Sequence, residues 1–285
     1  MVPRMTRIGF VSLTLAFFGG FQAPAAFAQK KTSPAQDDPQ MLSLEVVALQ
    51  TLNRLDLSTP QLEALLRLAK GTAGTPRSTG AMKVTPAFLK TLKALRSALL
   101  DDDDDRIGDL KEKLGDLLDK DKIQLDDRVP ISDAARRSAT QLIRLMQPSQ
   151  VLAYLQVIDE EEVDLFEILD EAIEAGKGAD TGKWKALRDQ AAGEAAWLIV
   201  GSDEAKSRVA TKFLASLLDQ HHNAKPGKNA FADLEKQVQQ LTAHLDPFEI
   251  LRHVMEREMA ELLSNPRLPL AIQHTLDQRR KLAAK

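Results

Sequence analysis

The chain has 285 residues, no cysteine, and a formal net charge of −3 at pH 7 from 38 basic and 41 acidic side chains. This length is sufficient for one large domain or two ordinary ones with a sizeable buried core. Hydrophobic residues make up 44% and charged residues 28%, which indicates a globular rather than a disordered chain. The absence of cysteine excludes disulfides, thiolate zinc sites and a thiol nucleophile.

The first 28 residues have the pattern of a cleaved signal peptide. Two arginines precede an apolar run over 8–21, and "AFA" at 26–28 places alanines at the positions that a signal peptidase reads. The run contains two glycines and is shorter than the roughly 20 apolar residues of a membrane-spanning helix. We therefore predict cleavage between Ala28 and Gln29, a periplasmic or secreted mature protein, and no transmembrane segment after cleavage.

The charge of the mature chain limits its partners. Removing 1–28 takes away two of the 38 basic residues and none of the 41 acidic ones, so the mature chain carries a net charge of −5 before its histidines are counted. An acidic chain is a poor match for the phosphates of nucleic acid. We therefore expect no nucleic-acid partner. Other envelope or secreted proteins are the expected partners, and the oligomeric state stays open.

Helical periodicity dominates the rest of the sequence. Residues 29–40, "QKKTSPAQDDPQ", are polar and proline-containing, which predicts a short flexible tether. From residue 41 onward, apolar residues recur at the three- and four-residue spacing of amphipathic helices. Such stripes run along residues 42–55, 62–69, 88–99, 107–118, 142–146, 151–158, 165–173, 184–198, 209–217, 231–241 and 248–255.

These stripes predict an all-α fold of roughly ten helices without a sheet, arranged as a multi-helix bundle or an array of helical hairpins. The only strand-like run, "WLIV", has four residues and is too short to build a sheet. The polar stretch 119–132 separates an N-terminal helical region, 41–122, from a C-terminal one, 132–285. The sequence leaves open whether the two regions form one continuous fold.

Several of the predicted helices begin with a capping residue followed by proline. In "LSTPQ", Ser58 is placed to cap a helix and Gln61 to bond back to the Ser58 backbone N–H, which is a capping box. Asp246 and Glu249 repeat this arrangement in "LDPFE". Proline is tolerated in the first turn because the N–H that it lacks has no intrahelical partner there.

The stretch "LSTPQ" at 57–61 resembles the Leu-Thr-x-x-Gln motif of the Spy/CpxP family, and "MQPSQ" at 146–150 resembles a second copy that lacks the Ser or Thr. Members of this family are small helical periplasmic proteins that act as chaperones and envelope-stress sensors. The resemblance therefore implies a chaperone-like or stress-related binding role. This chain is longer than those proteins and lacks their usual basic balance.

Five consecutive aspartates suggest two alternative structures. Over Asp101–Glu112, carboxylates fall at positions one, three, five, nine and twelve of a calcium-binding EF-hand loop. However, Arg106 occupies the position that needs glycine, and Gly108 occupies one that is usually apolar. A helix start fits better, because aspartates favour the first turn and an apolar stripe follows. We expect the tip of a helical hairpin here, with a calcium-responsive module as the alternative function.

The histidines offer two further candidate metal sites. His221 and His222 are adjacent and point about 100° apart on a helix, so they suit a helix C-terminus better than one shared metal. Glu249, His253 and Glu256 fall on one helix face and could hold a metal, but no second Glu-x-x-His copy is present to complete a di-iron site. We expect this second group to form a solvated, ion-paired helix face.

The sequence contains none of the common catalytic motifs. It has no Gly-x-Ser-x-Gly elbow, no phosphate-binding glycine loop and no His-Glu-x-x-His. The acidic run at 159–164 is typical of a solvated helix face. We predict that the protein is not an enzyme and has no catalytic residue, cofactor or metal site. We expect an extracytoplasmic protein that binds other proteins through amphipathic helix surfaces or grooves, in a chaperone-like, envelope-stress or structural role.

Overall fold

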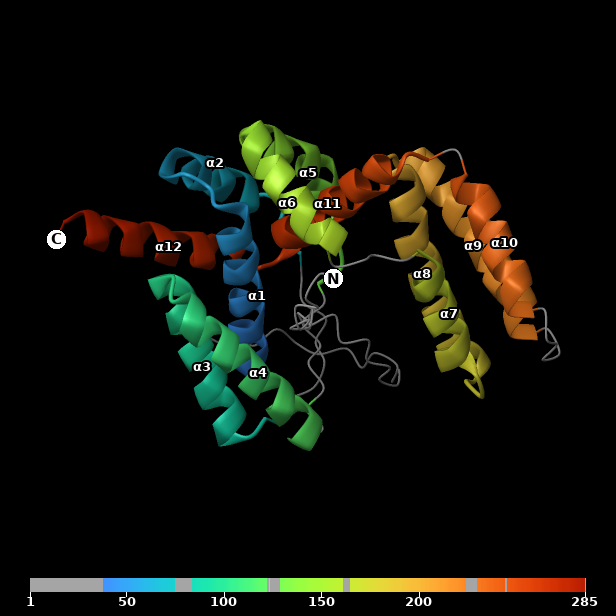
Figure 1. Ribbon diagram of the computed structural model, residues 1–285, viewed down its shortest axis with the longest axis horizontal. Coiled ribbons are helices and arrows are strands. Elements are labelled where there is room, and N and C mark those ends of the chain that lie inside the picture. Colours follow the sequence, from blue (N-terminus) through green and yellow to red (C-terminus); the bar gives the residue numbers. More distant parts are fainter. Residues whose placement is uncertain are drawn as a thin grey trace, which may run out of the picture.

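Figure 1 shows a computed structural model of the chain. It describes residues 38–74, 84–121, 123, 129–160, 165–223, 230–243 and 245–284. The predicted signal peptide lies outside the described residues, as does most of the predicted tether. The tether prediction is wrong at its end, because Pro39 already begins a helix. Asp38 caps that helix by accepting a hydrogen bond from the backbone N–H of Gln40 at 3.1 Å.

The predicted all-α fold is confirmed: the described residues form twelve helices and no strand. These are α1 (Pro39–Leu55), α2 (Thr59–Ala69), α3 (Pro86–Asp101), α4 (Asp104–Asp121), α5 (Asp133–Leu145), α6 (Pro148–Glu160), α7 (Leu165–Gly176), α8 (Thr181–Val200), α9 (Glu204–Asn223), α10 (Ala230–Thr242), α11 (Pro247–Ser264) and α12 (Leu268–Ala283). The number slightly exceeds the predicted ten, because a turn at 265–267 separates α12 from α11. None of the described helices has the length and hydropathy needed to cross a membrane.

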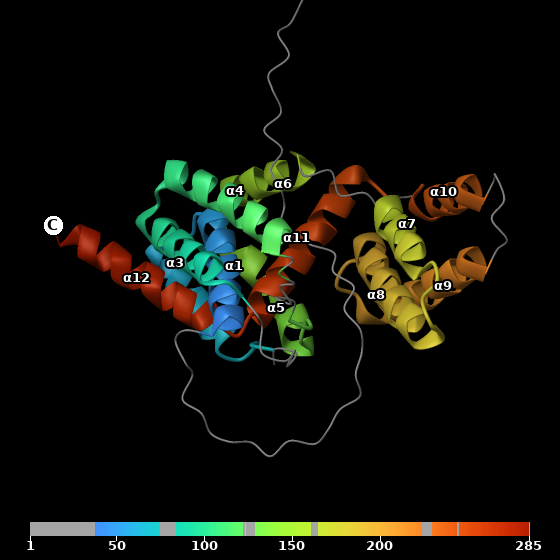
Figure 2. The ribbon, with the colours of Figure 1, turned by 90° about the horizontal axis from the view of Figure 1, so that it is seen from below.

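The helices form two groups that α11 connects. In the first group, α1 packs on α3 and α12, α2 packs on α12, and α3 forms a hairpin with α4. In the second group, α8 packs on both α7 and α9, and α10 lies against α7 and α9. Helix α11 runs from the second group into the first, where it packs on α5 and α6 (Figures 1 and 2). The first group therefore contains helices from the beginning of the chain together with α11 and α12 from its end.

The turn between α8 and α9 meets α11 through a buried histidine. Gly201 ends α8 with a positive φ of 63°. Its backbone lies so close to His253 that a Cβ on Gly201 would lie 2.6 Å from the ring Cδ2. His253 Nδ1 lies 2.8 Å from the carbonyl oxygen of Leu198, and Glu256 Oε2 accepts a hydrogen bond from the Ser202 backbone N–H at 3.3 Å. These contacts fix α8 against α11.

Candidate functional site

The aspartate run forms the tip of the α3–α4 hairpin. Asp101 ends α3, Asp102 adopts a left-handed φ of 56°, and Asp103 accepts a hydrogen bond from the backbone N–H of Arg106 at 3.3 Å. The rest of the candidate calcium loop, through Glu112, is helical. Among the described residues, no group of three or more His, Asp or Glu side chains is placed to hold a metal ion. The structure therefore does not bring the ligands of the calcium alternative together.

The other candidate metal ligands have separate partners. Glu249 Oε2 accepts a hydrogen bond from the backbone at the start of α11, whereas His253 and Glu256 contact the α8–α9 turn. The expected solvated face is wrong for His253, which is only 8% exposed because α11 packs against α8 on that side. Near the C-terminal end of α9, His222 stacks on Trp184 with ring centroids 3.9 Å apart.

The two pentapeptides that resemble one family motif lie at the starts of α2 and α6, and their glutamines meet. Gln61 Oε1 accepts a hydrogen bond from the Ser58 backbone N–H at 2.7 Å, which closes the predicted capping box. Gln150 Oε1 accepts one from the Gln147 backbone N–H, also at 2.7 Å. Each side-chain oxygen thus satisfies a backbone donor at the start of its own helix.

The amide nitrogens of the same two glutamines cross between the helices. Gln61 Nε2 donates to Gln150 Oε1 at 2.9 Å and to the carbonyl oxygen of Leu145 at 2.6 Å. Gln150 Nε2 donates to the carbonyl oxygen of Asp56 at 2.6 Å. We call this pair the glutamine clasp. Its amide groups are occupied by the protein itself, so it joins two helix starts rather than presenting free groups to a ligand.

Breaking the glutamine clasp should reveal coupling between its two halves. We expect Gln61→Ala and Gln150→Ala each to lower the free energy of unfolding by about 1–2 kcal/mol, because each removes several hydrogen bonds between and within the two helix starts. The double variant should lose less free energy of unfolding than the two single variants lose together, with a coupling energy of at least about 0.5 kcal/mol. Urea unfolding followed by circular dichroism measures all three, with the exposed Gln156→Ala as the control. If the two losses of unfolding free energy simply added in the double variant, the two glutamines would not interact as described.

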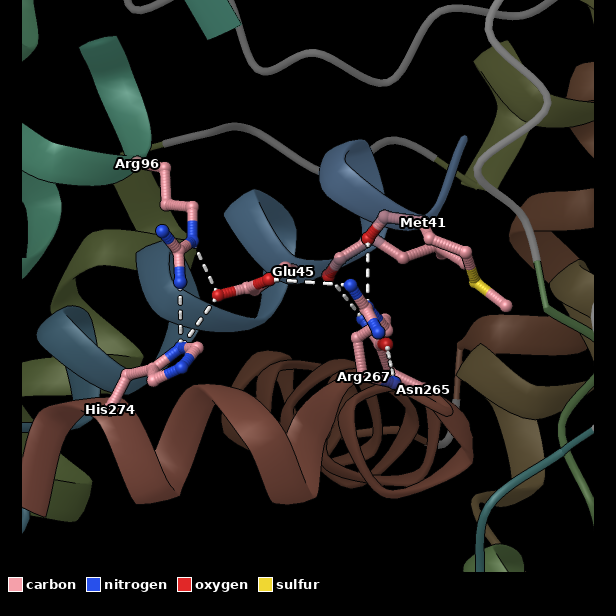
Figure 3. Close-up of polar contacts among 7 residues, drawn as sticks. Met41, Glu45, Arg96, Asn265, Arg267 and His274 are labelled. Atoms are coloured by element: carbon pink, nitrogen blue, oxygen red, sulfur yellow. Dashed lines mark hydrogen bonds and ion pairs between the residues drawn. The ribbon is translucent and has the colours of Figure 1, made fainter. Parts of the chain in front are cut away.

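A buried carboxylate joins three helices of the first group. Glu45 on α1 has a side chain only 3% exposed, and its Oε1 lies 2.5 Å from Arg96 Nε and 2.9 Å from His274 Nδ1 (Figure 3). Its Oε2 lies 3.7 Å from Arg267 Nη2. Arg96 Nη2 also lies 2.8 Å from His274 Nδ1. Because a ring nitrogen either donates or accepts a proton, Nδ1 forms one of its two hydrogen bonds at a time.

The polar side chains of this cluster pair with one another. Arg96 comes from α3, His274 from α12 and Arg267 from the turn before α12. Nearby, Asn265 Nδ2 donates to the carbonyl oxygen of Leu44 at 2.7 Å, so the same turn is held to α1 a second time (Figure 3). Cations that surround a buried carboxylate compensate for its lost hydration. The geometry is that of a structural junction between α1, α3 and α12.

Helix α9 exposes two large apolar side chains. Val209 is 71% exposed and Phe213 is 50% exposed, and the two lie one helical turn apart. The sequence stripe over 209–217 predicts that both are buried, and for these two the prediction is wrong. Only its other large members, Leu214 and Leu217, face the core. Periodicity alone does not show that α8 covers one side of α9 and leaves the other open.

Cations border this apolar pair on both sides. At 100° per residue, Lys206 and Lys212 each lie three residues from Val209 and project about 60° to either side of it. We call these four residues the α9 face. Lys206 Nζ lies 3.7 Å from Asp203, and the backbone N–H of Lys206 lowers the pKa of that carboxyl. Such exposed ion pairs are worth little in water, so both lysines remain available to an anionic partner.

No family model matches the chain, and neither a curated protein nor a solved structure matches it. The α9 face is therefore interpreted from its own geometry and chemistry.

Proposed function

We propose that this chain is a non-enzymatic, extracytoplasmic helical protein that binds other exported or envelope proteins on the α9 face. The observation that carries the proposal is the exposure of Val209 and Phe213 side by side between two lysines. Contiguous exposed apolar patches that polar residues surround mark sites of interaction with other proteins. Covering them with a partner would recover part of the roughly 1.5–3 kcal/mol that each gains on full burial.

The partner that fits best is an amphipathic helical segment with acidic residues beside an apolar stripe. Its apolar side chains would cover Val209 and Phe213, and its carboxylates would face Lys206 and Lys212. An anionic membrane is a poorer match, because helices that lie in a membrane bury an apolar face along their length. On α9, the large apolar side chains further along the helix, such as Leu214 and Leu217, face the core instead.

Export and the family resemblance support the same role. The N-terminal pattern predicts export of the mature protein from the cytoplasm, and there a chaperone-like protein would meet exported chains. The meeting of Gln61 with Gln150 supports the interpretation of the two pentapeptides as one repeated motif. Sequencing the N-terminus of the exported protein tests the first point. We expect it to begin at Gln29, and a chain that retains Met1 would contradict the predicted cleavage.

Peptide binding tests the α9 face directly. The probe is a fluorescent amphipathic peptide with leucines at three- and four-residue spacing and glutamates beside them, titrated with the mature protein by fluorescence anisotropy. We expect the Val209→Ser/Phe213→Ser double variant to bind about tenfold more weakly, because it loses most of the apolar area of the contact. Both side chains are exposed, so the variant should remain folded.

Matched controls give this experiment its specificity. Leu282→Ser removes another exposed apolar side chain, 57% exposed and on α12, and should bind the peptide as the wild type does. A peptide with lysines in place of the glutamates should bind more weakly. Equal binding by the wild type and the double variant would overturn the proposal. Binding of anionic vesicles in preference to the acidic peptide would also overturn it.

A further inference from the structure

A small polar cavity lies where α5 faces the turn before α9. Its volume is about 220 Å³, and it is lined by Asp133, Arg136, Arg137, Thr140, Ser202 and Glu204. The first four come from α5 in the first helix group, and the last two from the turn and start of α9 in the second group. Every lining side chain is polar, and two are cationic and two anionic. The lining therefore has a balanced charge and an ample supply of hydrogen-bonding groups.

Arg136 is the unusual member of this lining. Its guanidinium carbon lies over the ring of Trp197, 4.0 Å from the ring centroid, which is a cation–π contact. Burial lowers the pKa of Arg136, although Glu204 and Asp133 act against this shift from a distance. Among the described residues, the side chain of Arg136 has no hydrogen-bond or ion-pair partner, and its Nη1 is buried without one.

Other partly buried arginines of this protein are paired. Arg96 lies 2.5 Å from Glu45, Arg188 lies 2.6 Å from Asp219, and Arg257 lies 3.1 Å from Glu194. The side chains of these three arginines are between 21% and 29% exposed. A guanidinium offers a planar set of donors that matches two oxygens of a carboxylate. Arg136 has this donor set and lies over the Trp197 ring, but its side chain lacks the acceptor.

From these observations we infer that the cavity binds a small zwitterion of the α-amino-acid class, with its carboxylate on Arg136 and its ammonium toward Asp133 and Glu204. A simple anion fits less well, because it would have to lie beside the two carboxylates. A simple amine would leave the donors of Arg136 unsatisfied. The hydroxyls of Thr140 and Ser202 can bond to either end of the ligand. Such a ligand would contact both helix groups at once.

Calorimetry on the mature protein tests this inference, with L-alanine, L-glutamate, L-lysine and L-phenylalanine as separate probes. We expect at least one of them to bind. Propionate and ethylamine, which each carry only one of the two charges, should bind more weakly. Arg136→Gln should weaken the binding of the amino acid about tenfold or more, because it removes a charged pair of donors. Arg144→Gln, on the exposed side of the same helix, should leave it unchanged.

A second variant separates loss of binding from loss of folding. Thr140→Val keeps the size of the side chain and removes a hydroxyl from the lining, so it should weaken binding. The melting temperature should stay close to that of the wild type, because Thr140 is only partly buried. The inference is overturned if none of the four amino acids binds. It is also overturned if Arg136→Gln binds as tightly as the wild type, or if inorganic phosphate binds more tightly than every amino acid.

Discussion

Replacing Glu45 by glutamine is expected to lower the free energy of unfolding by about 3 kcal/mol, because it removes the anion from a buried charge cluster while the cations remain. The side chain is 3% exposed, so water cannot take over its role. The amide can still accept a hydrogen bond from Arg96, but it cannot balance the charges of Arg96 and Arg267. Denaturant unfolding followed by circular dichroism measures the change.

The control for Glu45 is an exposed acid in the same helix group. Glu63→Gln on α2 makes the same chemical change on the surface, and it should alter the free energy of unfolding by no more than about 0.5 kcal/mol. If Glu45→Gln were as mild as Glu63→Gln, the cluster in Figure 3 would not be the junction of α1, α3 and α12.

Gly201→Ala is expected to be similarly damaging, with a loss of about 3 kcal/mol from two additive causes. The first is backbone strain, because φ 63° with ψ −146° is a conformation that only glycine adopts readily. The second is overpacking, because the new Cβ would lie 2.6 Å from the His253 ring. His253 is buried and cannot move away without leaving the carbonyl oxygen of Leu198. Thermal and urea unfolding both measure this loss.

Gly193 provides a matched test in the same helix. A Cβ at Gly193 would meet no atom within 4 Å, and the residue lies in the middle of α8. Gly193→Ala should therefore stabilise the protein by about 0.5–1 kcal/mol through the higher helix propensity of alanine. Opposite signs at the two glycines are the expected result. Equal effects would show that the α8–α11 contact is not packed as described.

The helices could be predicted from the sequence because their causes are local. Three- and four-residue apolar spacing and the capping boxes at Ser58 and Asp246 depend only on neighbouring residues. The predicted stripes end at residue 255, although Leu268, Ala271, Ile272 and Leu276 have the same spacing and form the buried face of α12. The packing of α11 and α12 onto helices from the beginning of the chain could not be predicted, since it joins residues far apart in sequence.

In the candidate sites, too, local features could be predicted from the sequence, whereas contacts between distant residues could not. Glu45 looks like an ordinary surface acid in the sequence, because the partners that bury it lie 51 to 229 residues away. The two glutamine motifs could be recognised, but their contact across 89 residues could not. Val209 and Phe213 fit an apolar stripe, yet periodicity does not report which side of a helix its neighbours leave uncovered. Arg136 lacked any sequence signal that distinguishes it from a solvated arginine.

Aggregation of an exported, acidic model protein tests the central claim most directly. The client is unfolded by reduction, and light scattering follows its aggregation with and without the mature protein. We predict that the wild type and Leu282→Ser suppress aggregation equally, and that Val209→Ser/Phe213→Ser suppresses it much less while keeping the wild-type melting temperature. Equal suppression by all three proteins, or by none of them, would contradict a role for the α9 face in binding other proteins.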